Sequence, residues 1–177
     1  MIRLQQEADD EAVRTIVTAA FADDGGVAEL AEALRARADG GAGLVADDGG
    51  EVVGHVQLSR SWVDAPKQVV EVLVLSPLSV RPDRQREGIG KALLKAAIEV
   101  ATDAGAPVVF LEGDPAYYSR LGWEPAATYG FTSPSVRIPD AGFQAVVLPA
   151  HRPWITGALV YNDTFWSHDC VGLRRPT

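Results

Sequence analysis

The segment from residue 79 to residue 93 combines the end of a strand, a glycine-rich turn and the start of a helix. It reads Ser79-Val80-Arg81-Pro82-Asp83-Arg84-Gln85-Arg86-Glu87-Gly88-Ile89-Gly90-Lys91-Ala92-Leu93. A helix N-terminus leaves four backbone N–H groups unpaired and carries a partial positive charge. Glycines, which have no side chain, let a phosphate approach those N–H groups. The segment therefore predicts a site for a pyrophosphate, held by the N–H groups of residues 86–91.

Three phosphate-binding patterns compete for this segment. A dinucleotide fingerprint requires Gly-x-Gly-x-x-Gly, and Leu93 stands where its last glycine belongs. A P-loop requires an early glycine and a late Ser or Thr, and Gln85 and Ala92 occupy those places. The third pattern, Gln/Arg-x-x-Gly-x-Gly/Ala, is met by Gln85, Gly88 and Gly90. The alternative is an ordinary glycine-rich turn without a ligand.

The strand before the turn contains a proline, Pro77, within residues 72–80. Proline has no N–H group, so we expect the ladder of hydrogen bonds to break there. A break leaves backbone groups such as those of Leu78 and Val80 without a strand partner, and an extended amide-bearing ligand could pair with them. A pyrophosphate joined to an amide-bearing arm describes coenzyme A.

Three motifs in this order resemble the GNAT superfamily of acyl-CoA-dependent N-acyltransferases. They are Leu78-Ser79-Val80-x-Pro82, Gln85-x-x-Gly88-x-Gly90 and Tyr117-Tyr118-Ser119-Arg120-Leu121-Gly122-Trp123. The third is similar to the family's Phe-Tyr-x-x-x-Gly-Phe segment. Two further stretches look like a bacterial branch of uncharacterised N-acetyltransferases, namely Gly113-Asp114-Pro115-Ala116-Tyr117-Tyr118 and Tyr161-Asn162-Asp163-x-Phe165. The clear resemblance covers about residues 72–125.

The resemblance implies an α/β (α+β) fold, with a mixed, splayed central sheet flanked by helices. The splay would lie between the strand at 75–80 and the strand at 108–112, with acyl-CoA inside it. One domain would cover residues 1–177, with residues 125–177 as its strand-rich C-terminal part. The co-substrate implied is acetyl-CoA, without a metal. The residues expected to bind it are Leu78, Ser79, Val80, Gln85, Arg86, Glu87, Gly88, Ile89, Gly90 and Lys91.

Amide formation from a thioester requires a neutral amine, a stabilised carbonyl oxygen and a proton for the leaving thiolate. The resemblance implies that Tyr118 is the general acid beside the sulfur of coenzyme A; the alternative is a core tyrosine. An alkyl amine with a pKa of about 10 is protonated at neutral pH, so a base is expected. Glu71 is the first candidate, because burial within its apolar strand would raise the pKa of its carboxyl group. Glu112 is the second candidate for the base. The alternative for Glu71 is a solvated side chain without a catalytic role.

We therefore predict transfer of an acetyl group from acetyl-CoA to a primary amine, by direct attack through a tetrahedral intermediate. Cys170 lies outside the matched region, so nothing supports a covalent nucleophile. A module that binds or senses acyl-CoA without turnover is the alternative, and a nucleotide-binding protein is a third hypothesis. Aromatic side chains could wall an acceptor pocket or fill the core; they are Trp62, Trp123, Trp154, Trp166, Tyr129 and Tyr161.

Composition and net charge limit the classes of molecule that this protein is expected to bind. The 177 residues are 47% hydrophobic and 23% charged, as in a globular chain, which excludes a disordered one. The net charge of −8 argues against nucleic acid and favours a cationic acceptor, either a small molecule or a peptide amine. The charged N-terminus is unlike a signal peptide, and no apolar stretch reaches the length of a membrane span. We expect a cytoplasmic protein without a membrane partner, and a homodimer is one oligomeric state that the resemblance implies.

The elements that must position these residues follow from periodicity and turn signals. Strands are expected at 2–4, 43–46, 51–58, 69–80, 108–111, 136–138, 143–148 and 158–161. Helices are expected over 12–21, 27–34 and 89–101, with a short one from Pro115. Turns are expected at Asp24-Gly25-Gly26, Asp39-Gly40-Gly41 and Asp48-Gly49-Gly50. A doubly wound Rossmann domain would alternate strand and helix throughout, which this order does not.

Overall fold

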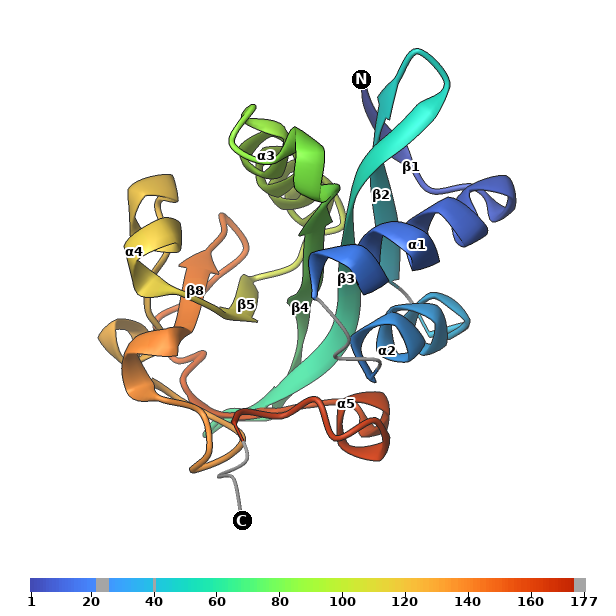
Figure 1. Cartoon of the computed structure of the whole chain (residues 1–177). Helices are drawn as coiled ribbons and strands as arrows, with labels where there is room; N and C mark the ends of the chain where they lie inside the picture. The colour runs from blue at the N-terminus through green and yellow to red at the C-terminus, as the bar shows by residue number, and fades with distance from the viewer. Residues whose placement is uncertain (22–25, 40, 174–177) are drawn as a thin grey trace. The chain divides into compact units, whose positions relative to one another are not determined.

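The computed structural model describes residues 1–21, 26–39 and 41–173, and Figure 1 shows its helices and strands. The chain divides into two compact units. The first comprises residues 1–59 and 75–101, and the second comprises residues 60–74 and 102–177. The assignment of the whole chain to a single domain stays a prediction.

The first unit is built from antiparallel strands and amphipathic helices. Its strands are β1 (Ile2–Leu4), β2 (Gly41–Asp48), the first part of β3 (Glu51–Asp64) and the last part of β4 (Val69–Val80). Its helical elements are η1 (Glu7–Asp9), α1 (Asp10–Ala20), α2 (Gly26–Arg35), η2 (Pro82–Arg84) and most of α3 (Ile89–Asp103). Strand β2 pairs antiparallel with β1 on one side and with β3 on the other.

The turn between β2 and β3 confirms the hairpin expected at Asp48-Gly49-Gly50. Gly49 and Gly50 have φ angles of 67° and 94°. Glycine adopts this left-handed region without steric cost, and a two-residue hairpin turn requires it. The other two expected turns include Asp24, Gly25 and Gly40, which lie outside the described residues.

Helices α1 and α2 bury the apolar stripes that the sequence predicted. On α1 the buried positions are Val13, Ile16 and Val17, and on α2 they are Ala28, Leu30, Ala31 and Leu34. Positions three and four apart lie on the same face of a helix, so each helix presents one continuous apolar surface to the core.

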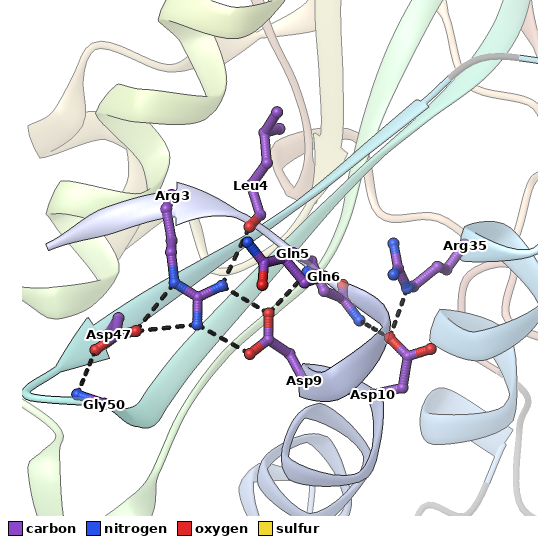
Figure 2. A network of polar contacts seen from close by, with 9 residues as sticks. All are labelled: Arg3, Leu4, Gln5, Gln6, Asp9, Asp10, Arg35, Asp47 and Gly50. Atoms are coloured by element: carbon purple, nitrogen blue, oxygen red, sulfur yellow. Dashed lines mark hydrogen bonds and ion pairs between the residues drawn. The ribbon is translucent and has the colours of Figure 1, made fainter.

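The N-terminus of the first unit is held by a network of charges around Arg3, which Figure 2 shows. The Arg3 guanidinium donates to both carboxylate oxygens of Asp9, at 2.7 and 2.9 Å, and to Asp47 at 3.0 Å. Asp9 also accepts from the backbone N–H of Gln6 at 2.7 Å. The hydrogen bonds from Arg3 lower the pKa of Asp9 to about 2. Arg3 thereby ties β1 to the start of α1 and to the β2–β3 hairpin.

The second unit contains the remaining strands, most of them short. Strand β5 (Val108–Glu112) pairs in parallel with the first part of β4 at Leu73–Val109 and Val74–Phe110, and antiparallel with β8 (Phe143–Val147). Strand β8 also pairs with β6 (Glu124–Pro125), and β9 (Gly157–Val160) pairs with β3 and with β7 (Phe131–Thr132). The helical elements are α4 (Pro115–Tyr118), η3 (Ser119–Leu121), η4 (Ala126–Tyr129), η5 (Asp140–Gly142) and α5 (Asp163–Ser167).

Aromatic packing forms the core of the second unit. Phe110 on β5 is fully buried. Its ring lies edge-on to Phe131 with centroids 4.9 Å apart and stacks on Phe143 at 5.5 Å. Both arrangements are favourable for aromatic pairs. Phe110 thereby joins β5, β7 and β8 in one apolar cluster.

The predicted fold class is confirmed: the protein has a mixed α/β fold with a central, mostly antiparallel sheet flanked by helices. The strand expected at 136–138 is wrong, because this segment forms a turn in which Val136 is fully exposed. Prolines at 134 and 139 flank it, and proline cannot donate to a strand ladder. The splay between the strands at 75–80 and 108–112 stays a prediction. Among the described residues, no helix has both the length and the apolar character of a membrane span.

Candidate active site

The motif residues of the first unit form a strand, a tight loop and a helix in direct succession. Strand β4 continues through Pro77 to Val80, and its pairing with β5 covers only Leu73 and Val74. The break in the hydrogen-bond ladder expected at Pro77 stays a prediction. Ser79 is buried, while Leu78 and Val80 are half-buried. The backbone N–H of Arg81 donates to Val53 O on β3 at 2.9 Å, and the turn η2 follows at once. The loop thus leaves the sheet from a strand end that is still hydrogen-bonded.

Gln85 closes the loop. Its side-chain Nε2 donates to the carbonyl oxygen of Val80 at 3.2 Å, across five residues. Two left-handed residues follow, Arg86 with φ 68° and Gly88 with φ 87°. A left-handed conformation is uncommon for a residue other than glycine, and Gly88 adopts it freely. This explains why the motif needs a long polar side chain at its first position and a glycine three residues later.

Helix α3 starts at the end of this loop. Its first helical hydrogen bond in the described chain runs from Ala92 N–H to Gly88 O at 3.0 Å. The N–H groups of residues 88–91 precede that bond and are the ones a helix leaves for a capping group or a ligand. Gly90 is half-buried and Lys91 is exposed, so this end of the helix is open to the surface.

Gly54 on β3 sets how closely α3 can approach the sheet. A Cβ atom at this position would lie 3.0 Å from Ile89 Cγ2, 3.0 Å from Leu93 Cδ1 and 3.2 Å from Ser79 O. Such contacts are tighter than ordinary van der Waals packing. The absence of a side chain therefore lets the first turn of α3 rest directly on β3. Gly54 was not among the predicted site residues, because a glycine within a strand shows no binding pattern.

The basic side chains beside the loop are mostly neutralised within the protein. Arg81 pairs with Asp83 at 2.7 Å and with Glu51 at 2.5 Å. Arg84 pairs with Glu87 at 2.8 Å and with Asp48 at 3.0 Å. These ion pairs brace the loop against the β2–β3 hairpin. They leave the exposed Arg86 and Lys91 as the cations of this segment that have no ion pair among the described residues.

In the second unit, Tyr118 lies on the short helix α4. Asp114 caps this helix by accepting from Ala116 N–H at 2.9 Å, and Pro115 occupies its first position. Asp before Pro at a helix start is a common capping arrangement, because the aspartate side chain accepts from a free N–H and proline needs none. Tyr118 is half-buried, and its ring lies edge-on to Trp123 with centroids 6.1 Å apart.

Gly113 makes room for the Tyr118 ring. A Cβ atom on Gly113 would lie 2.3 Å from Cε2 of that ring, which no side chain permits. Burial raises the pKa of Tyr118 to about 12, with smaller effects from Tyr117 and Asp114. The phenol therefore stays protonated throughout the physiological range. Among the described residues its hydroxyl has no hydrogen-bond partner, so it is able to donate to a ligand.

Glu112, at the end of β5, lies in a cluster that the sequence did not reveal. Tyr161 O–H donates to Glu112 Oε1 at 2.7 Å, and Gly172 N–H donates to Oε2 at 3.1 Å. Burial raises the pKa of this carboxyl group, although the two hydrogen bonds and the charge of Arg137 oppose the rise. Tyr161 itself is buried and stacks on Phe165 at 4.6 Å. Glu112 is thus a partly desolvated carboxylate held by neutral donors.

Glu71 lies in a solvated environment. Its side chain is 53% exposed, and its carboxylate pairs with Arg60 at 2.5 Å. Of the two alternatives for Glu71, the structure shows the solvated one, because its side chain leaves the strand on the solvent side. Its role as a base stays a prediction.

The stretch Tyr161-Asn162-Asp163-x-Phe165 has a structural role that local rules explain. Asn162 caps α5 by accepting from Thr164 N–H at 3.1 Å. Its Nδ2 donates to Arg60 O at 2.7 Å, and its backbone N–H donates to Ser61 Oγ at 3.2 Å. Asparagine before a helix start is a common N-cap, and this signal was present in the sequence.

The chain belongs to the GNAT acetyltransferases. The model of the acetyltransferase (GNAT) domain family matches residues 1–126, which include the whole strand–loop–helix segment and Tyr118. The predicted family is confirmed, and with it acyl transfer as the class of reaction.

Individual relatives agree with this assignment. The chain is 31% identical over 128 residues to the uncharacterised N-acetyltransferase YhbS of Escherichia coli K12, covering 72% of this chain and 75% of YhbS. It is 34% identical over 84 residues to YjhQ of the same organism, 48% of this chain and 46% of YjhQ, so it spans about half of that relative.

Two solved structures are similar over nearly the whole chain. The complex of Escherichia coli YhbS with CoA has a TM-score of 0.78 and 28% identity, covering 93% of this chain and 91% of YhbS. A GNAT acetyltransferase from Brucella melitensis in complex with acetyl-CoA has a TM-score of 0.73 and 28% identity, covering 93% and 97%. The first was crystallised with CoA and the second with acetyl-CoA.

Proposed function

We propose that this protein transfers an acetyl group from acetyl-CoA to a primary amine by direct attack. The observation that supports this most strongly is the loop from Val80 to Gly90, which Gln85 closes and which ends in the open N-terminus of α3. A pyrophosphate fits this cradle, because the N–H groups of residues 86–91 and the helix dipole both favour an anion. Leu78, Ser79 and Val80 would pair with the amide-bearing arm.

The chain's own residues supply the proton chemistry in this proposal. When bound, acetyl-CoA supplies the activated thioester. Tyr118 would donate a hydrogen bond to the departing sulfur, and burial keeps this phenol protonated. A thiol with a pKa of about 8.5 is a far stronger acid than this tyrosine, so Tyr118 acts best as a hydrogen-bond donor that stabilises the thiolate.

Glu112 and Glu71 are the two candidates for the base. Glu112 is the better supported, because its desolvated carboxyl group has a raised pKa. A raised pKa moves a carboxylate towards the range in which it accepts a proton at neutral pH. The Glu71 carboxylate is already engaged in an ion pair with Arg60, and its side chain is mostly exposed.

The acceptor class follows from charge. The net charge of −8 favours a cationic small molecule or peptide amine over an anionic substrate. The competing hypothesis is a module that binds acyl-CoA without turnover, and it would keep the cradle while lacking an effective base.

The test is the consumption of acetyl-CoA in the presence of a pooled library of amines, with the products identified by mass spectrometry. The proposal expects at least one acetylated amine whose formation requires the native protein and saturates with acetyl-CoA. Binding of acetyl-CoA without any product across cationic, neutral and peptide amines would favour the binding module instead. Failure to bind acetyl-CoA at all would overturn both hypotheses.

A further inference from the structure

A pocket lies within the first unit, between α1, α2 and β3, apart from the loop before α3. It has a volume of about 650 Å³. The polar residues of its lining include Glu7 on η1, Glu11 and Arg14 on α1, Arg35 on α2 and His55 on β3. The pyrophosphate cradle contributes none of its residues to this lining. The proposed acetyl transfer therefore does not account for this pocket.

The floor of the pocket combines two apolar side chains with one unsatisfied polar group. Val13, Ala31 and His55 are its buried residues, and His55 is only 1% exposed. Neither ring nitrogen of His55 has a hydrogen-bond partner among the described residues. Burial, together with the charge of Arg35, lowers the pKa of His55 to about 4 against the opposing effects of the nearby Gln57 side chain and of Asp10, so the ring is neutral at physiological pH. A neutral imidazole offers one donor and one acceptor, and leaving both unpaired is costly.

The charges at the rim decide which ligand suits the pocket. Both arginines are already paired: Arg14 contacts Glu32 at 2.5 Å, and Arg35 contacts Asp10 at 2.6 Å. Figure 2 shows the Arg35 guanidinium and the Gln5 amide converging on Asp10. An anion would therefore have to displace a carboxylate from its guanidinium.

Two carboxylates at the rim of the pocket are able to bind a cationic ligand. Glu7 and Glu11 have no ion pair among the described residues. They stand four positions apart on the continuous helical stretch formed by η1 and α1, which places them on the same face. The unpaired charge of the pocket is therefore negative, and it lies above a floor of methyl groups and a neutral imidazole.

From this arrangement we propose that the pocket is a binding site for a small aliphatic ammonium ion. The ammonium group would donate hydrogen bonds to the free imidazole nitrogen and to Glu7 or Glu11, and its methylene groups would contact Val13 and Ala31. This site is separate from acetyl transfer, and it requires no acetyl-CoA.

The test is a titration of the full chain with butylammonium chloride, followed by the backbone amide resonances in NMR. Butanol and sodium chloride serve as matched controls for shape and for ionic strength. The proposal expects saturable shifts concentrated in α1 and α2 with butylammonium, and no comparable shifts with either control. The absence of saturable shifts in α1 and α2, or shifts there that butanol reproduces, would overturn it, whatever butylammonium does at the acceptor site.

Variants separate the two parts of the site. The double substitution Glu7→Gln and Glu11→Gln alters exposed residues and leaves the core intact; it should weaken binding at least about threefold, as expected for exposed ion pairs. Glu99→Gln, on the exposed face of α3, removes a carboxylate elsewhere and should leave the affinity unchanged. His55→Leu should weaken binding about tenfold or more, the usual value of a hydrogen bond to a charged group. Equal affinity in the double variant and the native protein contradicts the proposal even if His55→Leu does not fold.

Discussion

Replacing Tyr118 with Phe removes one hydroxyl group and leaves the rest of the site in place. The ring lies against Gly113, where a Cβ atom would approach it to 2.3 Å, and edge-on to Trp123. Phenylalanine has the same ring, so this packing is kept. The hydroxyl has no hydrogen-bond partner among the described residues, and its loss should therefore cost little stability.

The expected decrease in kcat follows from the loss of the protonated Tyr118 hydroxyl group. With a pKa of about 12, the phenol is almost entirely protonated at pH 7 and remains a donor to the departing sulfur. Loss of one positioned hydrogen-bond donor to a developing negative charge typically lowers the rate about 10²- to 10³-fold. We expect a decrease in kcat within that range and an unchanged affinity for acetyl-CoA. We also expect kcat of the native protein to show no loss due to Tyr118 up to about pH 10.

The assay is steady-state acetylation of the amine found in the library screen, together with calorimetric titration of acetyl-CoA. Tyr117→Phe is the matched control, because Tyr117 is the exposed neighbour, 43% accessible, and carries the same hydroxyl. Native turnover in Tyr118→Phe, or an equal loss in both variants, would refute the role of Tyr118. A loss that arises only from weaker binding of acetyl-CoA would refute it as well.

Three further predictions concern the cradle, the base and stability in acid. Gly90→Glu should weaken acetyl-CoA binding at least about tenfold, because it adds a negative charge and a side chain at the start of α3. Lys95→Gln changes the net charge equally but lies further along α3, so it should leave the affinity unchanged. Equal affinities of the two variants for acetyl-CoA in calorimetry would contradict the pyrophosphate site. Glu112→Gln should lower kcat about 10²-fold or more, whereas Glu71→Gln should change kcat only slightly. If pH–rate profiles show the larger loss of kcat in Glu71→Gln, Glu71 is the base. The His55 side chain binds its proton near pH 6.5 when unfolded and near pH 4 when folded, so the free energy of unfolding should fall by about 3 kcal/mol as the pH drops between these values. Denaturation of the native protein and His55→Leu at several pH values should show this dependence only in the native protein.

The parts of the site that the sequence predicted are those that depend on neighbouring residues. The spacing of Gln85, Gly88 and Gly90 predicted the turn and the helix that follows it, since a loop closed within five residues and a helix start are both local structures. The cap at Asp114 is local in the same sense.

The parts that it missed depend on contacts between distant residues. Glu112 meets Tyr161 and Gly172, which are 49 and 60 positions away, and no spacing rule connects them. The apolar neighbours of Glu71 left a buried and a solvated side chain as alternatives, and alternation along the strand places it on the exposed face beside Arg60. Local pattern could therefore predict the loop and the helix start but not the environment of either carboxylate.

The central claim is that acetyl-CoA binds with its pyrophosphate on the loop before α3. A crystal structure of the protein with acetyl-CoA tests this most directly. We predict pyrophosphate oxygens within hydrogen-bonding distance of backbone nitrogens of residues 86–91, and the Tyr118 hydroxyl within reach of the sulfur. A pyrophosphate bound elsewhere, with these nitrogens facing only water, would contradict the account.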